Sequence, residues 1–510
     1  MGNLVNRYRS VLKKCHLINT FGSLAVAAIL VMGVTDGEAF SNAVGYNVTS
    51  TSTPGTTVSA TDTSENAVAS GIKAETSATY SVPSTITRAE ATAIGKQSAL
   101  SLGVFAQSSS GNRLTVNLAP LDISSTAVTE NGTSRSVGIY SDVNSSVSVH
   151  GGTIVSSAHS KNGIGEAFGA ISQNNSSVTL GADTIVASSE SSKHLSEPKS
   201  VGIHFSDNST FNVTSNRIRV DVSATHNGDV FSRKVNGIYG DKNSTLTMND
   251  ADISVREINS TPDKSGAAGI HLFTASTLAM KDASIRVAAV DHEGTFAGSA
   301  VGIVTSPTSG RHDITAGTLD IRAQGRWASG IQLQNTDMRM AGGTVMSSGL
   351  GRSAYGIRTT HANFTATGDI DVTTHADRSN STVGGILAVG KSSITMRGGS
   401  VTASSNGDGG AIGLYAKDGG SITKTGGDIT VVSTAIASGM DAFPTSKITY
   451  GDAKATTRIS VEGRNAYGVR ARGQAGSDQA ASIELTNGVI EARSHGDTAI
   501  AAYSASGDIG

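Results

Sequence analysis

Residues 201–222 read VGIHFSDNSTFNVTSNRIRVDV, and this stretch decides the fold. It opens with a glycine followed by an isoleucine (202–203) and continues with two apolar-polar-apolar triplets at 211–213 and 218–220. Short alternation of this kind is the pattern of a β-strand buried on one face. The run Asn-Ser-Thr at 208–210 separates the first strand from the second, because asparagine accepts the backbone angles of a tight corner. The stretch therefore predicts three short strands joined by corners.

The same pattern recurs along the chain. Regular recurrence at 20–50 residues is typical of solenoids, propellers and repeat arrays. A propeller blade needs four antiparallel strands and about 40 residues, whereas each period here offers three strands. We therefore predict an all-β chain forming a right-handed parallel β-helix of about 14 three-strand coils. The glycine-aliphatic pairs that mark the coils lie 26 to 35 residues apart and begin at Gly71, Gly103, Gly138, Gly169, Gly202, Gly237, Gly269, Gly302, Gly330, Gly356, Gly385, Gly413, Gly439 and Gly468.

The composition suits a neutral repeat protein. The 510 residues carry a net charge of −2, and only 16% of them are charged. This balance excludes a generally basic nucleic-acid-binding surface. The chain has 60 glycines but 7 prolines, which favours many close backbone approaches over a polyproline-like chain.

The first 39 residues have the features of an export signal. A basic region is followed by a 14-residue apolar run at 21–34, which is too short to span a bilayer comfortably as a helix. The small residues at 37–39 predict cleavage there, which would also remove the single cysteine, Cys15. We expect residues 1–39 to be a cleaved signal peptide, 40–66 a Ser/Thr/Asn-rich spacer or cap, and 67–510 the β-helix.

The segment that joins the third strand of one coil to the first strand of the next varies in length. Because every long insertion falls at this corner, all insertions are expected to project from one edge of the rod, where repeat proteins often bind partners. Two of the long insertions carry basic clusters. The candidate binding residues are Lys193, His194, Arg233 and Lys234.

The sequence offers no catalytic motif, so we expect no enzyme activity, no metal and no cofactor. An alternative is a polysaccharide-cleaving β-helix with Asp320 and Asp371 as outward carboxylates two coils apart, about 9–10 Å from each other and with Met346 between them. Asn-x-Ser/Thr triplets recur at one corner of the coil, where turn formation explains them better than glycosylation does. Lys424 occupies an inward position.

The repeated coil signature and the long N-terminal segment with Asn6-Arg7-Tyr8-Arg9 resemble the pertactin-like passenger domains of Gram-negative autotransporters. The resemblance implies Sec export and display of the rod at the cell surface or outer membrane, or its secretion. It also implies an adhesin or a serum-resistance-like virulence protein that binds a host protein or matrix component. The family's C-terminal β-barrel is absent from this sequence, so the passenger is expected to be truncated before it. Self-association as an aggregation factor remains an alternative.

Overall fold

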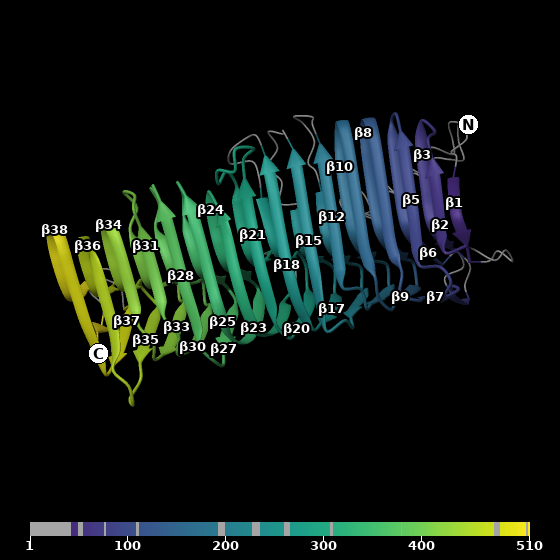
Figure 1. Cartoon of the computed structure of the whole chain (residues 1–510). Coiled ribbons are helices and arrows are strands. Elements are labelled where there is room, and N and C mark those ends of the chain that lie inside the picture. The colour runs from purple at the N-terminus through teal and green to yellow at the C-terminus, as the bar shows by residue number, and fades with distance from the viewer. Residues whose placement is uncertain are drawn as a thin grey trace, which may run out of the picture.

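The computed structural model describes residues 42–48, 55–75, 78–108, 112–191, 199–226, 235–259, 266–306, 310–378, 380–473, 480–505 and 508–509. These ranges form 39 β-strands. All the pairs between these named strands are parallel, and they join strands of neighbouring coils, as in the pairing of β13 (Lys199–Phe205) with β16 (Val235–Gly240). The strands follow one another in chain order along a rod (Figure 1). The predicted all-β parallel solenoid is therefore confirmed.

The strands line three faces of the rod, which we call the first, second and third sheets. The strands that lie only in the first sheet are β1 (Asn42–Asn47), β3 (Asn66–Ala74), β6 (Ser98–Gln107), β13 (Lys199–Phe205), β16 (Val235–Gly240), β19 (Gly266–Leu272), β22 (Ser299–Thr305), β24 (Trp327–Gln334), β26 (Ala354–Thr360), β29 (Val383–Val389) and β32 (Ala411–Lys417). Those only in the second sheet are β4 (Thr79–Ser81), β7 (Leu114–Leu118), β9 (Ser145–Val149), β11 (Ser177–Leu180), β14 (Thr210–Val213), β17 (Ser244–Met248), β20 (Ser276–Met280), β27 (Asn363–Ala366), β30 (Ser393–Arg397), β33 (Ser421–Thr425), β35 (Lys447–Gly451), β37 (Ser482–Thr486) and β39 (Asp508–Ile509). Those only in the third sheet are β2 (Thr57–Asp62), β5 (Arg88–Gly95), β12 (Thr184–Ser191), β15 (Arg217–His226), β18 (Asp250–Asn259), β21 (Ala283–Val290), β28 (Ile370–Asp377) and β31 (Val401–Ser405).

Seven longer strands run around a corner and belong to two sheets. Five of them join the third sheet to the first, and two join the second to the third. In β8 and β10 the pairing continues from Ile123 with Ile154 to Ser141 with Ser172, so the corner does not interrupt the hydrogen bonds. The sequence pattern predicts separate strands joined by corners, whereas in these seven strands the corner is part of the strand. Pairing persists because neighbouring coils have corners of equal length here. These strands are β8 (Asp122–Asp142), β10 (Thr153–Ser172), β34 (Ile429–Ala442), β36 (Thr457–Arg472) and β38 (Gly488–Ala505), with β23 (His312–Gly325) and β25 (Thr336–Leu350) at the other corner.

The interior holds stacked rows of aliphatic side chains, and the glycine of each coil makes this packing possible. Pairing in the first sheet joins Ile203 to Ile238 but skips the glycines before them, so the strand bends at the glycine. A Cβ atom on Gly237 would lie 2.3 Å from the Cγ2 atom of Ile253 in the third sheet and 2.6 Å from the carbonyl oxygen of Gly269 in the next coil. No side chain fits at such distances, which explains the recurring glycine.

The corner between the first and second sheets is built by asparagines. Asn144, Asn175, Asn208 and Asn243 occupy equivalent places in successive coils, with φ between 54° and 61°. Few residues other than glycine adopt this left-handed region as readily as asparagine. The corner therefore confirms the turn interpretation of these triplets.

Strands β1 and β2 fall within residues 40–66, the segment expected to be a spacer or cap. β1 pairs in parallel with β3, and β2 pairs in parallel with β5. The solenoid therefore extends into this segment.

Candidate functional site

The four predicted binding residues, Lys193, His194, Arg233 and Lys234, lie outside the described residues. Their places in the chain are nevertheless fixed by the strands around them. Residues 192–198 join β12 to β13, 227–234 join β15 to β16, and 260–265 join β18 to β19. All three segments thus connect the third sheet to the first in three successive coils. The expectation that every long insertion falls at this corner is wrong, because residues 473–481 connect β36 in the first sheet to β37 in the second.

A fourth insertion at this corner lies within the described residues. Residues 291–298 connect β21 to β22. The Asp291 carboxylate accepts hydrogen bonds from the backbone N–H groups of Glu293 and Thr295, at 3.0 and 2.8 Å. Residues 292–295 are exposed. The insertion thus presents an exposed turn at the edge of the rod.

A second apolar cluster lies on the outer face of the first sheet, opposite the interior core. The bend at each glycine brings together the residue before it and the residue two positions after it, and we call these two rows the outer trough. Part of the trough is almost fully buried, with Tyr140 at 2% and Phe168 at 3% exposure. The cluster consists of Leu100, Leu102, Phe105, Val137, Tyr140, Phe168, Ile171 and Val201, with Val68 and Tyr239 packed against it.

Aromatic rings continue the trough along the rod. His204 lies between Phe168 and Tyr239, with ring centroids 6.0 and 5.1 Å away, and His271 follows at 5.4 Å from Tyr239. The Lys199 ammonium lies 5.0 Å from the centre of the Phe168 ring. Burial, followed by the charges of Lys199 and other cations, holds the pKa of His204 well below its usual value. The imidazole is therefore neutral at neutral pH and packs as an aromatic ring.

The trough contains one partly open hollow between its side chains. Arg135, which forms part of its wall, makes a partly buried ion pair with Glu166. The hollow has room for about one water molecule, so it is not a pocket for a larger ligand as it stands. Its walls are formed by Arg135, Val137, Tyr140, Phe168, Ile171, Gln173 and His204.

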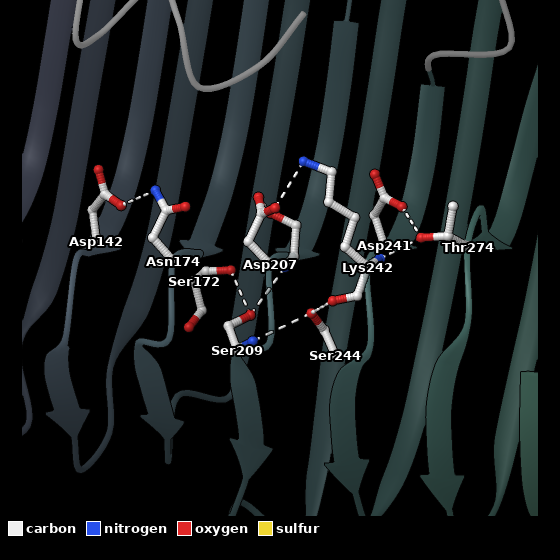
Figure 2. A network of polar contacts seen from close by, with 10 residues as sticks. Asp142, Ser172, Asn174, Asp207, Ser209, Asp241, Lys242, Ser244 and Thr274 are labelled. Carbon is white, nitrogen blue, oxygen red and sulfur yellow. Dashed lines mark hydrogen bonds and ion pairs between the residues drawn. The ribbon is translucent and has the colours of Figure 1, made fainter. Parts of the chain in front are cut away.

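A row of polar side chains follows the trough at the adjacent corner (Figure 2). Asn174 donates to the Asp142 carboxylate at 2.6 Å, and the Lys242 ammonium lies 2.7 Å from the Asp207 carboxylate. Asp241 accepts a hydrogen bond from a threonine of the next coil, and its burial raises the pKa of its carboxyl. Each carboxylate of the row is thus bound by a side chain of the following coil, and the row joins successive coils.

The two aspartates considered as a carboxylate pair lie in one row of the third sheet. Asp320 pairs with Thr344, which pairs with Asp371, so the expectation that Met346 lies between them is wrong. Asp371 accepts hydrogen bonds from both the backbone N–H and the hydroxyl of Ser400, each at 2.7 Å. These bonds hold the pKa of Asp371 below its usual value. Such a carboxylate stays ionised and fixes the corner, whereas a general acid needs a raised pKa.

Lys424 points into the rod and is fully buried. Its ammonium donates to the carbonyl oxygens of Gly398, Gly399 and Gly426, at 2.9, 2.6 and 2.5 Å. Burial lowers the pKa of this amine to about 8. The lysine thus binds the stacked glycine corners of two coils from inside.

Near the C-terminal end of the rod, the trough row that lies two positions after each glycine contains charged residues. The Asp441 carboxylate is fully buried between Arg470 and Arg472. The guanidinium of Arg472 lies 4.5 Å from the centre of the Phe443 ring, and that of Arg470 lies 4.8 Å from the Tyr467 ring. The two arginines thus neutralise the Asp441 carboxylate, as a buried carboxylate requires.

In the described ranges no three His, Cys, Asp or Glu residues are grouped so that they could hold a metal ion, and no helix is long and apolar enough to cross a membrane. Comparison with protein-family models, curated proteins and solved structures found no match for this chain.

Sequence reasoning missed the outer trough. The available signal was the second residue after each glycine, since these residues face outward and lie in register from coil to coil. In strand order that row is Phe105, Tyr140, Ile171, His204, Tyr239, His271, Val304, Gln332, Arg358, Leu387, Tyr415, Asp441, Arg470 and Tyr503. Once the coils are aligned in the sequence, this row shows mainly aromatic residues in its first half and several charged residues in its second half.

Proposed function

We propose that this chain is an exported rod that acts as an adhesin or host-factor-binding protein, as its resemblance to autotransporter passengers implies. The solenoid serves as a spacer and holds the contact segments at one edge. The partner is a host protein or matrix component that meets the segments 192–198, 227–234 and 260–265, which include the basic residues Arg233 and Lys234.

One observation carries this proposal. In three successive coils the extra residues enter at the same place, between the end of a third-sheet strand and the start of a first-sheet strand. In two other coils the third sheet is joined to the first by one continuous strand, β8 or β10, so the fold does not need the extra residues. Extra residues that the fold does not need, entering at the same place in successive coils of a repeat protein, favour a binding role.

The test is capture of partners from host serum and extracellular matrix by the full chain and by a variant with this edge shortened. In the variant each of the three segments is replaced by Asn-Gly, the dipeptide found at 131–132 and 162–163 in the continuous corners. The matched control shortens residues 452–456, which form a partly exposed corner between β35 and β36.

A partner captured by the full chain and the control, but not by the edge variant, is the expected result. Equal capture by all three proteins would contradict binding through this edge. Absence of any partner, together with clumping of particles that carry the chain alone, would support self-association and overturn the proposal.

A further inference from the structure

Three arginines on the outer face of the third sheet form a patch in successive coils. Arg256 lies in β18, Arg286 in β21 and Arg322 in β23, and all three are exposed. Neither Arg256 nor Arg286 has a carboxylate partner in the described chain. Arg322 has only a distant one, with its Nε atom 4.0 Å from an oxygen of Asp320. We call these three residues the arginine patch.

Two members of the patch are placed against each other. Arg286 pairs in register with Arg322 of the next coil. Neighbouring strands lie about 4.8 Å apart, and like charges opposite each other at this spacing repel. The chain therefore tolerates an unfavourable arrangement at this place.

Other arginines of the third sheet are paired. Arg88 lies 2.6 Å from the carboxylate of Glu90, and Arg219 lies 2.7 Å from that of Asp221. Arg256 and Arg286 differ because the residues beside them on the sheet are small or neutral apart from Arg322, whereas Arg322 has Asp320 two positions away on its own strand. The small or neutral neighbours of Arg256 and Arg286 include Ser223, Ser254, Ser284 and Ala288, and Met346 lies in register with Arg322 in the following coil. Short hydroxyl-bearing neighbours leave the guanidinium groups accessible on a flat face.

We propose that the arginine patch binds a sulfated polysaccharide, with one anionic group at each arginine. A guanidinium presents a planar fork of donors that matches an oxyanion in bidentate fashion. Two strand spacings carry the patch over about 10 Å along the rod, which suits a linear polymer lying on a flat sheet. The exposed Ser254, in register with Arg286 and two positions from Arg256, can bond a hydroxyl group of a sugar. This inference goes beyond the proposed function, because it concerns a face of the rod and not its insertion edge.

The experiment measures binding of the full chain to a heparin-derived oligosaccharide of defined length by calorimetry at several salt concentrations. The variant carries Arg286→Ser and Arg322→Ser, and the matched control carries Arg88→Ser on the same sheet. We expect at least a tenfold loss of affinity and a weaker salt dependence in the double variant, with no change in the control. Because the substitutions relieve a repulsion, the thermal midpoint should stay equal or rise.

Three results would overturn the proposal. One is an equal loss of affinity in the control and the double variant. Another is equal binding of the desulfated oligosaccharide. The third is equal or tighter binding of polyglutamate or single-stranded DNA, which would show that the patch attracts any polyanion. Capture of a host protein through the segments 192–198, 227–234 and 260–265 is measured in a separate experiment. The proposed function and the arginine-patch proposal can therefore fail independently.

Discussion

Replacing Gly237 by alanine should destabilise the rod because two groups occupy the place of the new methyl. The added Cβ would lie 2.3 Å from the Cγ2 atom of Ile253 and 2.6 Å from the carbonyl oxygen of Gly269. A methyl group forced into a packed core costs about 1–3 kcal/mol. The carbonyl belongs to the backbone and cannot turn away as a side chain can, so we expect a value at the upper end, about 3 kcal/mol.

Amide hydrogen exchange measured by mass spectrometry locates this loss. A loss of about 3 kcal/mol corresponds to roughly 100-fold faster exchange in the peptides that cover β16, β18 and β19. Gly55→Ala is the control, since its Cβ would have only one neighbour, 3.9 Å away. We expect little change there.

A double variant separates the two clashes. Ile253→Ala removes the γ-carbon that meets the new methyl, at its own cost of about 2–5 kcal/mol. The combined loss should be smaller than the sum of the two single losses, because one clash has been removed. Equal exchange in Gly237→Ala and Gly55→Ala would refute the reasoning, since it would show that the strand shifts at little cost.

Three further predictions concern buried charges. The pKa of Lys424 is about 8 in the folded chain instead of 10.5, so between these pH values the unfolded chain binds more protons than the folded one. The free energy of unfolding, measured with urea and compared with that of Lys424→Met, should therefore rise by up to about 3 kcal/mol from pH 8 to 10.5. Asp441→Ala leaves two partly buried arginines without their carboxylate and should cost about 3–5 kcal/mol by the same assay. Glu484→Gln, in an exposed pair, should cost far less, because solvent screens that pair. Burial raises the pKa of Glu257, which lies 2.8 Å from His226; stability should therefore fall as the pH rises above about 4.5, and a Glu257→Gln variant that keeps this slope would contradict the assignment.

The fold was predictable because its determinants are local. Gly202 with Ile203 and the alternating residues at 211–213 and 218–220 fix a strand, a corner and a buried face within one period. Repetition then settles the rest, since one coil cannot bury enough apolar surface alone and each coil must stack on the next. The same local reasoning identified Asn208 as a corner residue, which its φ of 61° confirms.

Site prediction from sequence was less complete. The prediction placed Met346 between Asp320 and Asp371, because it counted outward positions without the register between coils. A shift of two residues along a strand keeps a side chain on the same face, so alternation alone could not detect the error. Register comes from hydrogen bonds between residues far apart in sequence. In the structure it pairs Arg286 with Arg322.

The repeating unit follows from the amino-acid sequence: which side chains face inward, where each coil turns and where a glycine is needed. These follow from backbone angles and from alternation over a few residues. Which outward residues of neighbouring coils contact each other depends on the register between strands, and so on the tertiary structure. The neutral His204 between two aromatic rings and the carbonyl contacts of buried Lys424 arise only when coils stack. The physical reason is that burial and charge neighbours belong to the stacked assembly, and a single coil has neither.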